Sequence, residues 1–370
     1  MAKNGYQTLG DVVKKTADGI NYSVVWEELN EIRSLWNEER NKIAALLSYP
    51  TTSAADAVPQ TLSDDSFTVA SEYGVPPAVS PASAVLCGYS FQDYNLATRF
   101  TWKFLREATF DQVREAWASV LAADSKLTAG KVLQRIFTPT QGLSPEGNPV
   151  RGLWNGSDGL APLPHMGMTF PSSTSHYVAT ENATLDSLDV EDAMNMITQK
   201  GYGTNPGSQI IILANPVQSE QIQSWRAGVE SRTSGPVAKF DFIPSASAPA
   251  YLTDKRIVGS TAPTDYSGLP VKGSYGRGWL IESNYVPLNY VLVAATNGPN
   301  NPGNVCAFRE HVSNAWRGLL LIPGNQQRFP LQESFGHRAF GTGVRHRGAA
   351  IALHVTASST YTPPTIIANQ

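Results

Sequence analysis

Apolar residues recur at helical spacing near the start of the chain. Between Tyr22 and Leu47 they return at steps of three and four, with Glu and Arg between them. Pro50 follows and cannot continue a helix. We therefore predict one amphipathic helix over residues 22–47. Its two tryptophans, Trp26 and Trp36, could belong to an ordinary core or to an arm that docks on a neighbouring molecule.

Residues 49–98 lack any such period. Ser, Thr, Ala and Asp dominate this stretch, and it is interrupted by Pro59, Pro76, Pro77 and Pro81. Its apolar spots, such as 67–69 and 85–86, are too brief for a core. Structureless stretches of this length are uncommon inside a compact domain and are usually functional loops or linkers. We expect this segment to lie on another subunit.

The strongest helical pattern follows. Thr109 and Gln112 form a capping box, and apolar residues then recur in helical steps as far as Phe137, before Pro139. At a rise of about 1.5 Å per residue, the helix would be about 40 Å long. Its apolar stripe covers one side only, so we expect it to lie across a sheet rather than through a core.

The second half of the chain mixes helices and strands. Asp189 to Lys200 reads as a helix, and 209–214 reads as a buried strand followed by an N-cap, Asn215, and by Pro216 at the first helical position. That helix is expected to run to about Gly228. Short strands and turns should fill 236–305, and 318–322 is an apolar run. Alternation over 347–357 predicts a last strand with one buried face.

Composition adds a hint about the surface. Only 16% of the 370 residues are charged, whereas 13 Phe, 14 Tyr and 8 Trp are present. Such a surface is typical of a chain that neighbours cover, because interface cores are poor in charge and rich in aromatic residues. The net charge of -3 argues against dedicated nucleic-acid binding, which needs a basic stripe.

Targeting signals and cysteine frameworks are not evident. Cys87 and Cys306 form neither a CxxC motif nor a disulfide pattern, which favours a reducing compartment. The N-terminus lacks a signal-peptide pattern, and the longest apolar runs are too short to span a bilayer. We expect a soluble protein that is synthesised in the cytoplasm and contacts no membrane.

Motifs for catalysis are also missing. The strand-to-helix turn at 214–216 has no glycine, and Pro216 removes an N–H group that a bound anion would need. The sequence holds no GxxxxGK[ST], no GxSxG and no HxxxH. We predict no catalytic, cofactor-binding or metal site, and no cofactor.

One basic, glycine-rich run occupies 341–348. It could contact phosphate. The alternative is a turn that feeds the last strand, with Arg345 and Arg347 on a surface or against a carboxylate of another subunit. We favour the alternative, because no helix N-terminus adjoins the glycines.

The order of these elements, together with the stretches Asn95–Thr109, Ala183–Asp189 and Phe340–Ala350, resembles the major capsid proteins of tailed double-stranded-DNA bacteriophages. The likeness is greatest to phages of actinobacteria, and it covers nearly the whole chain. It implies an α+β fold, the tailed-phage capsid fold shared with encapsulins. It also implies a structural subunit, not an enzyme, which self-assembles into the icosahedral head shell around the phage genome.

The resemblance implies five parts. These are an N-terminal arm (1–48), an extended loop (49–108), a peripheral domain with a spine helix (109–204), an axial domain (205–325) and a C-terminal return to the peripheral sheet (326–370). The expected location is the virion, after synthesis in the bacterial host cytoplasm. The expected partners are many copies of the chain in hexamers and pentamers, a portal, a scaffolding protein and, through weak non-specific contact, the packaged double-stranded DNA.

Two departures from better-known members of this family matter. Only about 48 residues precede the loop, so we expect a separate scaffolding protein, or none, and no maturation cleavage. Between residues 43 and 102 the chain has no lysine, and Lys103 is the first. We therefore expect no isopeptide crosslink from the loop, and non-covalent contacts between subunits instead. The candidate contact residues are Trp26, Trp36, Phe67, Val69, Tyr73, Val85, Leu86, Arg345 and Arg347.

Two alternatives compete with a phage shell. An encapsulin-type nanocompartment shares the fold but encloses protein cargo, and its chains look shorter, with a less elaborate loop. A cytoplasmic α/β enzyme would rest on the strand–helix unit at 209–228 alone. Packaged DNA in purified particles would distinguish a phage shell from an encapsulin. A discrete monomer or dimer in sedimentation would favour the enzyme.

Overall fold

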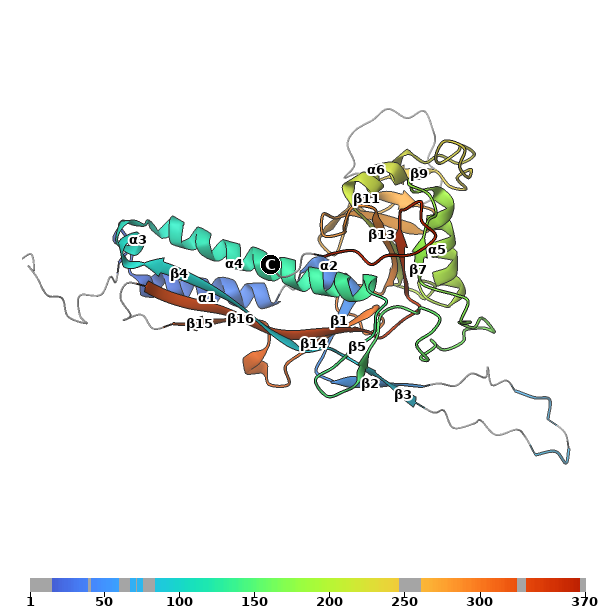
Figure 1. The fold of residues 1–370 in the computed structure, drawn as a ribbon, viewed down its shortest axis with the longest axis horizontal. Helices are drawn as coiled ribbons and strands as arrows, with labels where there is room; N and C mark the ends of the chain where they lie inside the picture. The colour runs from blue at the N-terminus through green and yellow to red at the C-terminus, as the bar shows by residue number, and fades with distance from the viewer. Residues whose placement is uncertain are drawn as a thin grey trace, which may run out of the picture.

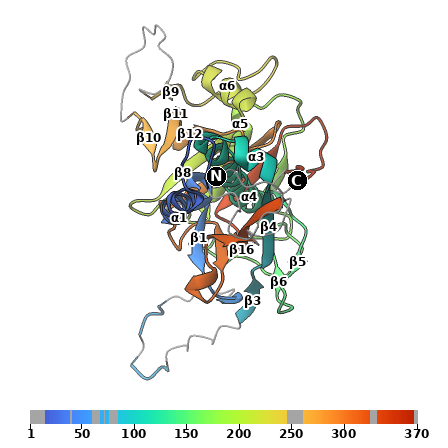
Figure 2. The same ribbon diagram turned by 90° about the vertical axis from the view of Figure 1, so that its left-hand side faces the viewer.

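The computed structural model describes residues 15–38, 41–59, 67–70, 72–75, 84–245, 261–324 and 331–366. Figure 1 shows an elongated limb, built along the helix α4 (Phe110–Phe137), that ends in a lobe holding most of the remaining strands. In the view of Figure 2, along the limb, the lobe helices α5 and α6 lie above α4 and the strands β1, β4 and β16 below it. No helix among these residues is long and apolar enough to cross a membrane.

The limb sheet has one long central strand, β16 (Leu331–Val344). On one edge β16 pairs antiparallel with β4 (Gln92–Thr101), from Leu331 opposite Thr101 to Phe340 opposite Gln92. Along the other edge it pairs with β15 (Leu319–Pro323) and then with β14 (Cys306–Glu310), and β14 pairs in parallel with β1 (Ser48–Thr51). The helix α3 (Trp102–Glu107) joins β4 to α4.

The helix α4 crosses from the limb into the core of the lobe. Its expected capping box is present, with the Gln112 side chain accepting a hydrogen bond from the Thr109 N–H. The first half buries one stripe, as predicted. The second half does not follow the prediction, because four consecutive residues from Leu127 to Gly130 are buried. Small side chains such as Ala129 let this half pass between the two sheets.

The N-terminal helical region is two helices rather than one. The helix α1 (Tyr22–Glu38) lies along the limb, and α2 (Lys42–Leu47) is buried in the core. Asn41 explains the break. Its backbone is not helical (φ -46°, ψ 124°), and its side-chain oxygen accepts hydrogen bonds from the N–H groups of Ile43 (3.0 Å) and Ala44 (3.3 Å). Asparagine is a strong helix-starting residue, and it begins a second helix here.

The lobe is built on an eight-stranded sheet. Its order is β10-β11-β12-β8-β13-β17-β7, with β9 paired to β11. The strands are β7 (Tyr177–Ala179), β8 (Gln209–Ala214), β9 (Phe242–Pro244), β10 (Asp265–Tyr266), β11 (Leu269–Tyr275), β12 (Gly278–Glu282), β13 (Tyr290–Thr296) and β17 (Ala350–His354). The helices α5 (Ser187–Gln199) and α6 (Pro216–Ser224) cover one face, and the end of α4 packs on the other.

Two details of the lobe differ from expectation. The last strand, β17, is buried on both faces, because Ile351 packs under α5 and α6 while Ala352 faces α4. This strand also lies beside β13 in the lobe rather than in the limb sheet, and it is β16 that returns to the limb. The cap at Asn215 and Pro216 is present, but α6 ends at Ser224 because the backbone of Trp225 is extended.

A small third sheet lies under the junction of limb and lobe. It consists of β2 (Ala55–Pro59), β3 (Ala84–Gly88), β5 (Gly142–Leu143) and β6 (Pro149–Val150). A short 3-10 helix (Asn314–Trp316) lies between β14 and β15. Because β2 and β3 pair antiparallel, the two ends of the intervening segment leave the body side by side.

Candidate functional site

The expected extended loop, 49–108, contains β1 to β4 and α3, and of these β1 and β4 pair within the limb sheet. We keep the name extended loop for residues 60–83, between β2 and β3. Its described parts are 67–70 and 72–75, which Figure 1 shows in blue, away from the limb and the lobe. The side chains of Phe67 (108%), Val69 (97%) and Tyr73 (92%) are as exposed as in an isolated peptide. No described residue of the same subunit covers them. Exposed apolar patches are typical of surfaces that bind another molecule, and a contact between these residues and a neighbour stays a prediction.

The other two loop candidates lie at its base on β3. Val85 is partly buried against a small cluster that contains Val58 and Leu160, whereas Leu86 is half exposed (49%). Alternate residues of a strand point to opposite sides, so Val85 fixes the base and Leu86 faces outward. Of the two, Leu86 is therefore the better candidate for a contact with a neighbour.

A polar cluster fixes the loop base to the limb sheet. Asp56 on β2 accepts hydrogen bonds through Oδ2 from the hydroxyls of Tyr89 (2.5 Å) and Tyr49 (3.3 Å). The guanidinium of Arg345 lies 3.4 Å from the same oxygen. Burial raises the pKa of both tyrosines above the ordinary range, so both hydroxyls stay protonated and can donate. We call Tyr49, Asp56, Tyr89 and Arg345 the loop anchor.

The glycines of the 341–348 run have a packing role at this anchor. A Cβ atom on Gly341 would overlap the carbonyl oxygen of Ser90, and one on Gly343 would lie 2.6 Å from the ring of Tyr89. The chain that leaves β3 therefore crosses β16 at a distance that only glycine allows. The residues that follow, 345–349, form the turn that leads into β17, which was the favoured alternative.

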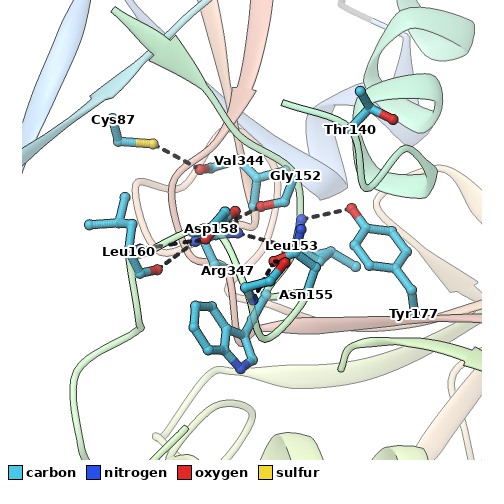
Figure 3. Close-up of polar contacts among 12 residues, drawn as sticks. Cys87, Thr140, Gly152, Leu153, Asn155, Asp158, Leu160, Tyr177, Val344 and Arg347 are labelled. Carbon is cyan, nitrogen blue, oxygen red and sulfur yellow. Dashed lines mark hydrogen bonds and ion pairs between the residues drawn. The ribbon is translucent and has the colours of Figure 1, made fainter. Parts of the chain in front are cut away.

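Arg347 ties three stretches of chain together inside the subunit (Figure 3). Its guanidinium binds both carboxylate oxygens of Asp158, one of them at 2.7 Å. It also donates to the carbonyl oxygens of Gly152 (2.9 Å), Leu153 (2.9 Å) and Leu160 (2.5 Å). It lies 5.4 Å from the ring of Trp154.

The prediction that Arg347 contacts another subunit is wrong. Its side chain is only 3% exposed and that of Asp158 only 9%, and the acid lies 189 positions earlier in the same chain. A planar guanidinium matches a carboxylate in two parallel hydrogen bonds, and this geometry is favoured where both groups are buried. Arg345 is also paired within the subunit, with Asp56, but it remains partly exposed.

The arm candidates pack on their own subunit. Trp26 meets Trp117 of α4 edge to face, with ring centroids 6.3 Å apart. The indole N–H of Trp36 donates to Asp124 Oδ2 at 2.9 Å, and Arg338 from β16 binds the same oxygen at 2.9 Å. Both tryptophans therefore hold α1 against α4, and a contact between this arm and a neighbour stays a prediction.

Four residues that organise these sites escaped the sequence reasoning, namely Asp56, Tyr89, Asp124 and Asp158. Each is a common residue type with no local motif. Their partners lie far away in the sequence, as with Asp124 and Arg338, which are 214 positions apart. No period or spacing rule operates at such separations. Only Asp158 offers a local signal, as a lone aspartate in a Gly- and Pro-rich stretch, and that signal is weak.

Metal and redox chemistry find no support in the described part of the chain. No group of three or more His, Cys, Asp or Glu residues is arranged there to hold a metal ion. Cys87 and Cys306 are both buried, and neither is part of a disulfide. Burial raises the pKa of the Cys87 thiol, which keeps it in the unreactive protonated form.

Comparison with known proteins gives a clear relative. A chain in the structure of Mycobacterium phage Patience is 34% identical, covers 98% of this chain and 96% of its own length, and superposes with a TM-score of 0.73. The capsid of a native GTA particle aligns with 84% of this chain (90% of its own) at 14% identity and a TM-score of 0.48. The holo-SrpI encapsulin of Synechococcus elongatus aligns with 90% (98% of its own) at 13% and 0.45. Neither a family model nor a curated protein matches the sequence.

Proposed function

This chain belongs to the family of major capsid proteins of tailed double-stranded-DNA bacteriophages, and we propose that its extended loop holds the shell together through non-covalent contacts. The subunit is a structural protein of the virion that assembles with copies of itself. The proposal concerns how the copies hold one another, and it rests on the full exposure of Phe67, Val69 and Tyr73.

We expect these apolar side chains to be buried against a neighbouring copy in the assembled particle. Burying one large side chain contributes roughly 1.5–3 kcal/mol. Several loops in each capsomer would therefore supply a stable interface without a covalent bond. The sequence supports the absence of an isopeptide crosslink from the loop, because no lysine occurs between residues 43 and 102.

The arrangement of the sheets supports a division of labour within the subunit. We assign the limb, with α4 as its spine, to the peripheral domain, and the lobe to the axial domain that meets its copies in hexamers and pentamers. The observed strands refine the boundaries. β14 and β15 belong with the limb, although they fall within 205–325, and α5 packs on the lobe sheet, although it falls within 109–204.

The remaining partners follow from the family. We propose a portal, a scaffolding protein, and weak non-specific contact with packaged DNA, for which the net charge of -3 offers no strong attraction. We further propose that the subunit is synthesised in the cytoplasm of the bacterial host and catalyses no reaction.

Sedimentation of the expressed chain tests the proposal. The expected result is megadalton particles that fall apart in denaturant into single subunits of 40.0 kDa. A ladder of covalent multimers in a denaturing gel would contradict the non-covalent part. A monomer or dimer at every concentration, with scaffolding protein supplied, would contradict assembly through the loop.

A further inference from the structure

A groove lined by two basic side chains lies on the limb, beside the edge of β4 that does not pair with β16. It has a volume of about 250 Å³ and runs between α4, β4, the β5–β6 hairpin and β16. Lys131 and Arg135 of α4 both line it. Tyr94, Gln134 and Leu143 also line it, and no carboxylate does. We call this the cation groove.

Neither cation has an anionic partner among the described residues. The Lys131 ammonium contacts only neutral groups, the Gln134 amide oxygen at 3.2 Å and the Tyr94 ring at 5.6 Å. Arg135 donates to the carbonyl oxygens of Thr138 (2.6 Å) and Thr140 (2.7 Å), and its Nε is buried without a hydrogen bond. Burial lowers the pKa of both side chains. Two partly desolvated cations side by side attract an anion strongly.

The chain itself carries an acidic segment. Residues 60–83 contain Asp64, Asp65 and Glu72 but no Lys, Arg or His. Glu72 is exposed, and its neighbour Tyr73 is 92% exposed. These parts of the loop lie away from the limb of their own subunit (Figure 1). The acidic side chains of one copy would therefore meet the cation groove of another copy.

The rim of the cation groove also suits an aromatic residue. Leu143, in the β5–β6 hairpin, is 72% exposed and borders the two cations. An acidic residue followed by an aromatic one could place its carboxylate on Lys131 and its ring on Leu143 at the same time. The sequence Glu72-Tyr73 has this order.

We propose that the cation groove of one subunit receives Glu72 from the extended loop of a second copy, with Tyr73 packed over Leu143. The proposal rests on the shell function above and adds the docking site and its charge pairing. It makes the loop contact specific, because a pair of opposite charges fixes register where apolar contact alone does not.

Charge reversal tests the pairing in full-length particles. Lys131→Glu should weaken the particles against urea, and Glu72→Lys should do the same, each by at least about tenfold in the subunit dissociation constant. The double variant that carries both changes should recover most of the loss, because it restores an opposite pair. The control is Lys126→Glu, the same change at an exposed site of the same helix outside the cation groove.

The possible results distinguish failure of the groove pairing from failure of the shell function. Additive losses in the double variant, or a Lys131→Glu effect no larger than that of Lys126→Glu, would overturn the groove pairing while wild-type particles leave the shell function intact. A loss confined to DNA-filled particles would assign the groove to nucleic-acid phosphate and overturn the pairing. If Lys131→Glu does not yield folded subunits, Lys131→Ala with Glu72→Ala gives the same cycle, and coupling is again required. Absence of any wild-type particle would instead contradict the proposed function.

Discussion

Replacing Arg347 with methionine should destabilise the subunit severely without touching the extended loop. The substitution keeps a long, flexible side chain but leaves the Asp158 carboxylate, which is 9% exposed, without its cation. It also removes the donors to the carbonyl oxygens of Gly152, Leu153 and Leu160. Breaking a buried ion pair from one side costs about 3–5 kcal/mol. That is a large part of the roughly 5–15 kcal/mol that stabilises a typical domain.

Urea unfolding of dissociated subunits measures this loss. Arg277→Met serves as the control, because Arg277 is exposed and should change the free energy of unfolding by less than about 0.5 kcal/mol. The double variant Arg347→Met/Asp158→Leu should recover part of the loss, because no buried charge is left alone. A loss below about 1 kcal/mol for Arg347→Met would refute the reasoning, as would a double variant that is no more stable than the single one.

Three further predictions concern the same framework. His176 is fully buried, and burial lowers its pKa to about 4. The unfolded chain binds a proton near pH 6.5 that the folded chain does not, so the free energy of unfolding should fall as the pH drops from about 6.5 to about 4, by up to about 1.4 kcal/mol per pH unit. His176→Gln should flatten this slope in acid titrations, and an unchanged slope would contradict the assignment. Gly341→Ala should abolish soluble subunit, since its Cβ would overlap Ser90, whereas Gly142→Ala, whose Cβ meets only Val150 at 4.0 Å, should remain soluble in expression trials. Trp36→Phe should lower the free energy of unfolding by about 1 kcal/mol by removing the hydrogen bond to Asp124, and a neutral result in urea would show that the bond contributes little.

The sequence predicted those parts of the fold that depend on neighbours along the chain. The capping box at Thr109, the proline-led start of α6 and the strand at 209–214 all follow from local rules, and the structure confirms them. The break at Asn41 is also local, but a continuous apolar period concealed it. The spacing of apolar residues shows which side of a helix is apolar, and this spacing does not change where one helix ends and the next begins.

The predictions were wrong where contacts between residues far apart in the sequence determine the structure. The strand β17 looked one-sided because its second face carries Ala350 and Ala352, small residues that are buried under α4. Arg347 looked like a surface residue because its partner, Asp158, is 189 positions away. The stretch 49–98 looked structureless because it lacks a period, yet β1 and β4 within it find their partners in β14 and β16, more than 200 positions away. The loop anchor was not predicted either, since Tyr49, Asp56 and Tyr89 come together only in the folded chain.

An electron cryomicroscopy map of assembled particles tests the central claim most directly. The account predicts that residues 67–75 of one subunit lie on the limb of a second copy, with no continuous density between a loop side chain and its neighbour of the kind that a covalent bond gives. A loop that folds back on its own subunit, projects into solvent in the finished shell, or is covalently joined to the next subunit would contradict it.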